Sequence, residues 1–326
     1  MIRLETNRIK TLDSLRGLAV FSVVLFHYNT FNYGYLGVHL FFIMSGFVIF
    51  MSVQKVNKPL DFLRNRFCRL YPAYWFCVTL TAIWILSFSN KLISLNMYLM
   101  NLTMFQQFFR VEHIDGAYWS LEIELLFYFG VAILLTTNKI WKYIEYLLVI
   151  VILSVLLTFI QDNPHITFLN LMLRYTGLFY AGIIFYKIWI NGFNYKDSIK
   201  IVIAYLCVIC FDFGNQSGFY YKPVEVFYLT LIFLLFILFA LKKLQFIEIK
   251  PLLFLGKISY SLYLLHEVIG LIILKYLDGV FSSKIFSTVC TIFIVILFSW
   301  FTNKYIEVPG SKFFKMYFSR INRSKI

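Results

Sequence analysis

The sequence predicts an all-α polytopic membrane protein, a bundle of about ten transmembrane helices with both termini in the cytoplasm. Three observations predict this class. First, 60% of the 326 residues are hydrophobic and only 14% are charged, whereas soluble domains are roughly half apolar and about a quarter charged. Second, the apolar residues form runs of about twenty, the length that crosses a bilayer. Third, Lys and Arg gather in particular loops, the asymmetry that orients membrane proteins.

The apolar runs define the expected spans of a single transmembrane domain, residues 1–326. In chain order, these spans are 12–30, 35–52, 71–89, 118–138, 143–160, 166–186, 198–213, 223–241, 252–276 and 285–303. The run 92–109 is dotted with Asn and Gln, and we expect an interfacial or re-entrant piece there. This choice collects most Lys and Arg on one side, which positive-inside asymmetry makes the cytoplasm. The tails 1–11 and 304–326 are basic and cytoplasmic in this topology.

The net charge of +14 does not predict a nucleic-acid partner, because the basic residues follow the loops of the predicted topology. Their expected partner is the membrane lipid bilayer, whose anionic headgroups attract Lys and Arg. The five cysteines lie in or beside apolar runs, and the five histidines have no chelating spacing. The sequence therefore predicts no metal site.

The first span lies in the stretch TLDSLRGLAVFSVVLFHYNTF and carries Asp13, Arg16 and His27. Arg16 and His27 are eleven residues apart, which on a helix brings both to one face at depths that differ by roughly 16 Å. Asp13 can pair with Arg16 on that face. One interpretation is a helix anchored at its ends by snorkelling side chains. The other is a site through the membrane, with an anion held at Arg16 and acid–base or nucleophilic chemistry at His27.

A second basic cluster precedes the third span in FLRNRFCRLYPAYW, where Arg66 and Arg69 share a helix face. A positive-inside anchor explains these residues without a ligand. A phosphate-bearing ligand at the cytoplasmic face explains them together with Arg16, because guanidinium groups bind phosphate through a planar fork.

Two carboxylates, Glu122 and Glu124, enter the fourth span in AYWSLEIELLFYFG. Carboxylates in an apolar helix need buried partners or have a function. The topology places this pair in the outer half of the membrane, at the level of His27. Trp119 precedes them in the position of an ordinary interfacial anchor. Arg174 is an intramembrane cation for which the two glutamates are candidate partners, in a structural ion pair or in a catalytic role.

The ninth span contains GKISYSLYLLHEVIG, which holds Ser259, Ser261, His266 and Glu267. Ser259 and His266 are seven residues apart and lie nearly on one helix face. Helix–helix hydrogen bonding explains the serines. A supporting role at a functional site explains the serines and His266 together.

At these blocks, the sequence resembles the acyltransferase 3 family of membrane acyltransferases. The similar blocks are LDSLRGLAVFSVVLFHY, GYLGVHLFFIMSGFVIF, FLRNRFCRLYPAYW, AYWSLEIELLFY, GKISYSLYLLH and the terminal IEVPG. They occur in the family's order and cover nearly the whole chain. The family's arginine–ten residues–histidine motif matches Arg16 and His27, its RxxR motif matches Arg66 and Arg69, and its Trp-Ser-Leu-x-x-Glu pattern matches Trp119, Ser120 and Glu124.

The resemblance implies a helical bundle in a bacterial-type cytoplasmic (inner) membrane that takes an acyl group, preferably acetyl, from acyl-CoA on the cytoplasmic side. The acceptor it implies is a hydroxyl of a cell-surface or exported glycan. Some family members carry an extra hydrolase-like domain after the bundle. We expect this chain to be a bundle-only member that acts alone, with a separate partner protein or as a homo-oligomer.

The residues and the resemblance combine into one expected mechanism. Arg16, Arg66 and Arg69 would hold the phosphates of acetyl-CoA or another acyl-CoA. His27 would act as general base or accept the acyl group covalently. Glu124 would orient His27, with Glu122 as its substitute. The residues expected to support the site are Asp13, Trp119, Ser120, Arg174, Ser259, Ser261 and His266.

A transporter or flippase for a glycan or lipid-linked sugar is the alternative function. Many spans and intramembrane charges suit a transporter equally well. Transporters often show related halves, and the sequence contains no internal repeat. A membrane acyltransferase is therefore the preferred prediction.

Overall fold

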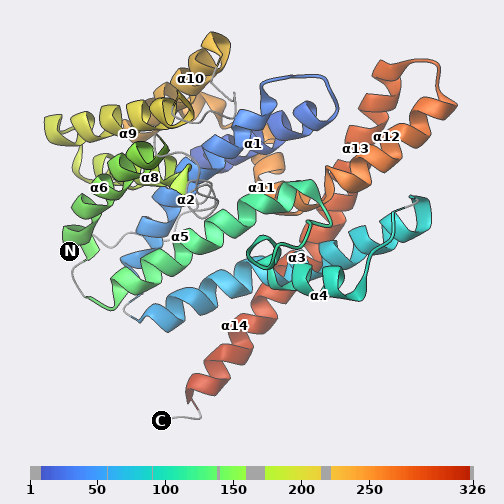
Figure 1. Ribbon diagram of the computed structural model, residues 1–326, viewed down its shortest axis with the longest axis horizontal. Helices are drawn as coiled ribbons and strands as arrows, with labels where there is room; N and C mark the ends of the chain where they lie inside the picture. Colours follow the sequence, from blue (N-terminus) through green and yellow to red (C-terminus); the bar gives the residue numbers. More distant parts are fainter. Residues whose placement is uncertain are drawn as a thin grey trace. The chain divides into compact units, whose positions relative to one another are not determined.

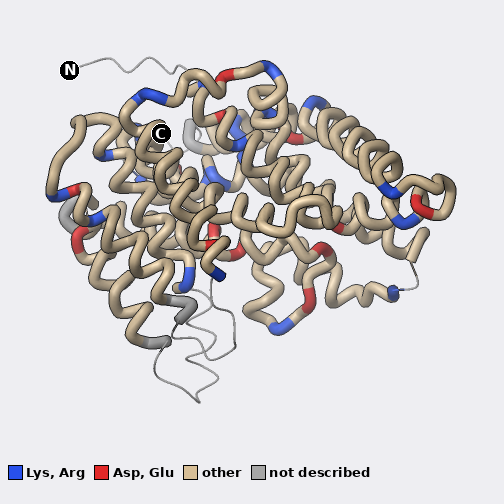
Figure 2. The backbone as a smooth tube through the Cα atoms, turned by 90° about the horizontal axis from the view of Figure 1, so that it is seen from above, with Lys and Arg blue, Asp and Glu red and all other residues tan. Residues whose placement is uncertain are grey.

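The computed structural model describes residues 9–56, 58–89, 91–137, 140–158, 173–213 and 222–323. All regular secondary structure in these residues is helical and none of it is strand, which confirms the predicted all-α class. Residues 166–172 of the expected sixth span lie outside the described residues. Figure 2 shows long stretches of the helices without a charged residue, as an apolar bundle requires.

The chain divides into two compact units. The first contains residues 1–22, 35–52 and 141–257, and the second contains 23–34, 53–140 and 258–326. Helix α1 (Lys10–His27) contributes its beginning to the first unit and its end to the second.

Close backbone crossings build the first unit. Its further helices are α2 (Gly37–Val53), α6 (Ile140–Thr158), α8 (Thr176–Asn191), α9 (Tyr195–Phe213), α10 (Pro223–Ala240) and the beginning of α11 (Lys250–Leu265). A Cβ on Gly256 of α11 would lie 1.8 Å from the carbonyl oxygen of Asp13, and one on Gly182 of α8 would lie 2.0 Å from that of Ile43. Small residues permit such contacts between helices in membranes, where packing replaces the hydrophobic effect.

The second unit is arranged around the long helix α3 (Pro59–Phe88), which packs against α4, α5, α12 and α14. In Figure 1, α12 and α13 lie side by side, and α14 continues from α13 through a π-helical turn, η5. The other elements of this unit are α4 (Leu95–Thr103), η2 (Gln106–Phe109), η3 (Gly116–Tyr118), α5 (Trp119–Leu135), α12 (Val268–Val280), α13 (Lys284–Thr302), η5 (Asn303–Glu307) and α14 (Val308–Arg323).

The membrane topology is supported at a coarser level than the sequence predicts. Among the described residues, five helices are long and apolar enough to cross a membrane, or six if α11 and α12 form one broken span. The number of spans and the cytoplasmic placement of both termini stay predictions. Helix α4 has 9 residues and is therefore about 14 Å long, which agrees with the interfacial or re-entrant piece expected there.

Three features differ from the predicted spans. Helix α3 begins at Pro59, before the expected start of the third span at residue 71, so Arg66 and Arg69 belong to the same helix as that span. The expected ninth span is bent by 80° between α11 and α12. The residues of the expected tail form helix from 304 to 323, because Phe314 and Phe318 pack against Phe67 of α3.

The bend between α11 and α12 is held from outside by Asp115. One carboxylate oxygen accepts a hydrogen bond from the Ala117 amide at 3.0 Å, and the other accepts from the Val268 amide, at the start of α12, at 3.1 Å. A carboxylate at a helix N-terminus is favoured by the helix dipole. Burial nevertheless raises the pKa of Asp115 from its ordinary value of 3.8 to about 7. Asp115 therefore connects the segment before α5 to the start of α12.

The Gly256→Ala substitution tests the close crossing of α1 and α11. We expect it to lower the thermal unfolding temperature in detergent, because overpacking costs about 1–3 kcal/mol. Gly130→Ala is the matched control, since a Cβ there meets no atom within 4 Å and Ala favours a helix over Gly by roughly 0.5–1 kcal/mol. Equal unfolding temperatures for the two variants would contradict the crossing.

The Asp115→Asn substitution tests the tie between η3 and α12. Folding raises the pKa of Asp115, so its proton stabilises the folded state fully below about pH 4, and this contribution is lost as the pH rises through about 7. We expect the unfolding temperature of the variant to fall less between pH 5 and pH 8 than that of the wild type. The same pH dependence in both proteins would rule out this role.

Candidate active site

His27 and Glu267 form an accessible pair in the second unit. His27 is the last residue of α1, and its Nε2 lies 3.8 Å from Oε2 of Glu267, the second of the two residues between α11 and α12. The two side chains are 22% and 18% exposed. The distance is that of an ion pair and is longer than a hydrogen bond. An imidazole and a carboxylate are thus placed together where another molecule can reach them.

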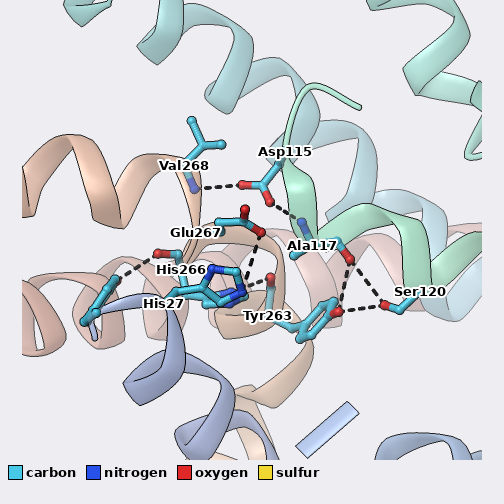
Figure 3. Close-up of polar contacts among 9 residues, drawn as sticks. His27, Asp115, Ala117, Ser120, Tyr263, His266, Glu267 and Val268 are labelled. Carbon is cyan, nitrogen blue, oxygen red and sulfur yellow. Dashed lines mark hydrogen bonds and ion pairs between the residues drawn. The ribbon is translucent and has the colours of Figure 1, made fainter. Parts of the chain in front are cut away.

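His266 packs against the other side of His27. The two rings are 4.9 Å apart and nearly perpendicular, and His266 is completely buried (Figure 3). Its Nδ1 lies 2.8 Å from the carbonyl oxygen of Tyr263 and must therefore carry the proton. Its Nε2 has no hydrogen-bond partner in the described part of the chain. The hydroxyl of Tyr28 donates to the carbonyl of His266 at 2.8 Å, which fixes the end of α1 against the bend.

The start of α5 and the residues just before it pack beside these side chains. The hydroxyls of Ser120 and Tyr263 are 2.7 Å apart, and Tyr263 donates to the carbonyl of Ala117 at 3.0 Å (Figure 3). Gly116 leaves room for the neighbouring carboxylate, since a Cβ there would lie 2.3 Å from Oε1 of Glu267. Ser120, predicted as a supporting residue, is brought to the site by these contacts.

A second polar cluster surrounds Arg66 on α3. Its guanidinium lies over the rings of Phe62 and Tyr128, at 5.6 and 5.8 Å from their centroids. The hydroxyl of Tyr128 donates to Glu124 at 2.5 Å. Nε and Nη1 of Arg66 are buried and have no hydrogen-bond partner among the residues that the structure describes. Buried donors of this kind suit an anionic ligand.

The terminal block IEVPG also lies in the second unit. Glu307 accepts hydrogen bonds from Ser261 at 2.6 Å and from Asn303 at 2.9 Å. The hydroxyl of Tyr260 donates to the carbonyl of Leu70, the residue after Arg69, at 3.0 Å. Ser261 is therefore explained by a helix–helix hydrogen bond, one of the two interpretations left open by the sequence.

The remaining predicted residues divide between the units. In the first unit, Asp13 pairs with Arg16 at 3.3 Å, as the spacing predicts, and Arg174 lies over the ring of Tyr175. The grouping of Arg16 with the α3 arginines stays a prediction. In the second unit, Trp119 begins α5 and Ser259 is buried on α11.

The two fourth-span glutamates make different contacts. Glu122 is buried and accepts the backbone amides of Gln107 and Phe108, at 3.4 and 3.2 Å, so it caps η2. Glu124 accepts a hydrogen bond from Tyr128, one turn along its own helix and in contact with Arg66. The carboxylate 3.8 Å from His27 belongs to Glu267, and the expected role of Glu124 in orienting His27 stays a prediction.

The sequence assigns no role to Glu267, Asp115 or Tyr128. Glu267 stands beside His266 in the ninth span, but no Gly or Pro marks the bend that places its carboxylate beside His27. Asp115 precedes a helix start, a common place for a cap, and this signal was available. Within the described residues, no group of three His, Cys, Asp or Glu side chains is arranged to hold a metal ion.

Comparisons with known proteins identify the family of the chain. A family model described as an acyltransferase domain, of the acyltransferase 3 type, matches residues 9–304. The O-acetyltransferase OatA of Staphylococcus aureus strain NCTC 8325 is 29% identical over 354 aligned residues, covering 92% of this chain and 57% of that protein. OatA of strain COL has the same identity and coverage. The chain thus spans a little over half the length of these curated relatives. No solved structure matches the chain.

The family match takes in most of the chain and contains His27, Arg66 and Glu267. Both polar clusters of the second unit therefore lie in the matched region, apart from Glu307. The chain belongs to the acyltransferase 3 family of membrane acyltransferases.

Proposed function

We propose that the protein is a membrane O-acyltransferase that moves an acyl group, preferably acetyl, from cytoplasmic acyl-CoA to a hydroxyl of a cell-surface or exported glycan. The observation that carries the proposal is the partly exposed His27, which lies beside a carboxylate and a buried second imidazole. Such an imidazole suits proton transfer from a hydroxyl. The relatives named O-acetyltransferase support acetyl as the group and oxygen as its acceptor.

The arginine cluster supports acyl-CoA as the donor. Arg66 offers buried donors without hydrogen-bond partners, and Arg69 lies exposed one turn further along α3. Guanidinium groups bind phosphate oxygens in pairs, with charge-assisted bonds about twice as strong as neutral ones. In this proposal Glu124 acts through Tyr128, which lies against Arg66, and orients the donor site. The predicted contribution of Arg16 to phosphate binding belongs to the same proposal.

The reaction needs one proton transfer and one bond exchange. His27 removes the proton of the acceptor hydroxyl while the oxygen attacks the thioester carbonyl carbon. The carbon–sulfur bond then breaks, and the departing thiolate takes the proton from His27. In the second route, His27 itself attacks the thioester and passes the acyl group to the hydroxyl. Both routes require a neutral, accessible imidazole.

Acyl transfer is tested with the purified protein in lipid nanodiscs, [14C]acetyl-CoA and cell-surface glycan as acceptor. We expect labelled glycan from the wild type and a loss of at least about 100-fold for His27→Ala, because a positioned base contributes roughly 10²–10⁴. His113→Gln is the control, since His113 bonds to Gln106 outside both clusters. Full activity in His27→Ala, or movement of unlabelled glycan across vesicles without acetylation, would overturn the proposal.

Donor binding is tested by Arg66→Gln, measured as the KM for acetyl-CoA. We expect a rise of about 10- to 100-fold, because each hydrogen bond from a charged donor is worth about 1.5–3 kcal/mol and about 1.4 kcal/mol is tenfold. Arg64→Gln on the same helix is the matched control, because Arg64 is paired with Asp61 at 3.5 Å. An unchanged KM in Arg66→Gln would remove Arg66 from the donor site.

A further inference from the structure

Glu267 differs from the other carboxylates of the second unit in what its oxygens contact. Asp115 and Glu122 each accept two backbone amides. Glu307 accepts a serine and an asparagine, and Glu124 accepts a tyrosine hydroxyl. Oε2 of Glu267 is buried and has no hydrogen-bond partner among the described residues. A carboxylate in an apolar helix is costly and marks a functional site by default.

The group that faces this oxygen is the imidazole of His27. Its Nε2 lies 3.8 Å from Oε2 of Glu267, a separation that hydrogen bonding would shorten by about 1 Å. Catalytic hydrogen bonds are often long before substrate binds. The other titratable groups around the pair are His266, Asp115, Tyr28 and Tyr263. The side chains of His266, Asp115 and Tyr28 are each fixed by a hydrogen bond to a backbone group.

Three features of the fold place Glu267 here. The chain turns by 80° between α11 and α12, Asp115 holds the first amide of α12, and Gly116 has no Cβ to fill the space of the carboxylate. The carboxylate of Glu267 is therefore held in a fixed position, and its Oε2 is pre-organised to accept a hydrogen bond.

We propose that Glu267 is the positioning residue for His27, and this rests on the proposed acyl transfer at His27. Glu267 accepts the Nε2 proton of His27, which leaves Nδ1 as the nitrogen that takes the proton from the acceptor hydroxyl. The oxygen attacks the thioester carbon, the carbon–sulfur bond breaks, and the Nδ1 proton passes to the thiolate. Glu267 keeps its charge throughout and stabilises the imidazolium formed in between. His266 stays neutral and limits the rotation of the His27 ring.

Glu267→Gln tests this assignment with a side chain of the same shape. We expect kcat to fall about 10- to 100-fold with the KM for acetyl-CoA unchanged, because positioning a base acts on the chemical step. The acidic limb of the pH profile should move to lower pH, since a carboxylate favours the protonated imidazole. Glu112→Gln is the matched control, because the Glu112 side chain is 80% exposed. An unchanged kcat and pH profile in Glu267→Gln would overturn the assignment.

Gly116→Ala displaces the carboxylate without removing it. A Cβ at this position would lie 2.3 Å from Oε1 of Glu267, so the variant should reproduce the loss of kcat while Glu267 and His27 are both present. Gly130→Ala controls for the glycine replacement itself, because that position is open. Wild-type kcat in a folded Gly116→Ala protein would contradict the need for this geometry.

A readout without catalysis separates this proposal from the proposed function. In the protein with 15N-labelled histidine, the imidazole signals of His27, assigned by their loss in His27→Ala, should show protonated Nε2 in the wild type and a changed tautomer ratio in Glu267→Gln. If this change occurs but no acetyl transfer is found in the wild type, the proposed function fails and the pairing stands. If transfer depends on His27 but neither the signals nor kcat respond to Glu267→Gln, the pairing fails alone.

Discussion

The hydrogen bonds of Asp115 are the constraint on which the candidate active site depends. A helix that carried straight on from α11 into α12 would have no free amide at Val268 for a side chain to bind. The 80° bend exposes that amide, and Asp115 binds it together with the amide of Ala117. Breaking a buried carboxylate's contacts is costly because the charge loses its compensation. The bend, the start of α5 and the carboxylate of Glu267 are therefore fixed by one side chain.

The polar side chains of the second unit follow a single rule. Hydrocarbon offers no donors, so each buried carboxylate must find them in the protein. Glu122 finds two amides at the start of η2, and Glu307 finds Ser261 and Asn303. The satisfied carboxylates shape the backbone around the site. Among the described polar atoms of this unit that lack a partner are those of the Arg66 guanidinium and Oε2 of Glu267, and these two groups face a proposed substrate and a proposed base.

Local spacing predicts much of this arrangement, whereas contacts between residues far apart in the sequence cannot be predicted from it. The helical class, the pairing of Asp13 with Arg16 and the importance of His27 and Arg66 follow from periodicity and from the cost of charges in apolar runs. The partner of His27 does not, because Glu267 is 240 positions away and reaches it through a bend without Gly or Pro. Predicted depth and the family resemblance favour Glu124 in that role. In the structure Glu124 accepts a hydrogen bond from Tyr128, four residues along the same helix, a spacing that brings side chains together.

Helix α11 connects the two polar clusters of the second unit. Ser261 bonds to Glu307 and Tyr260 bonds to Leu70 beside Arg69, whereas Tyr263 bonds to Ser120 and to the carbonyl of Ala117. Residues two positions apart point to opposite sides of a helix, so α11 reaches Glu307 with the side that carries Ser261 and the start of α5 with the side that carries Tyr263. The donor contacts proposed at Arg66 and the base proposed at His27 belong to one reaction, so the helices that carry them need a constant separation. Helix α11, hydrogen-bonded both to α3 and to the start of α5, provides it, while His27 and Glu267 keep the partial exposure that the proposed acceptor needs.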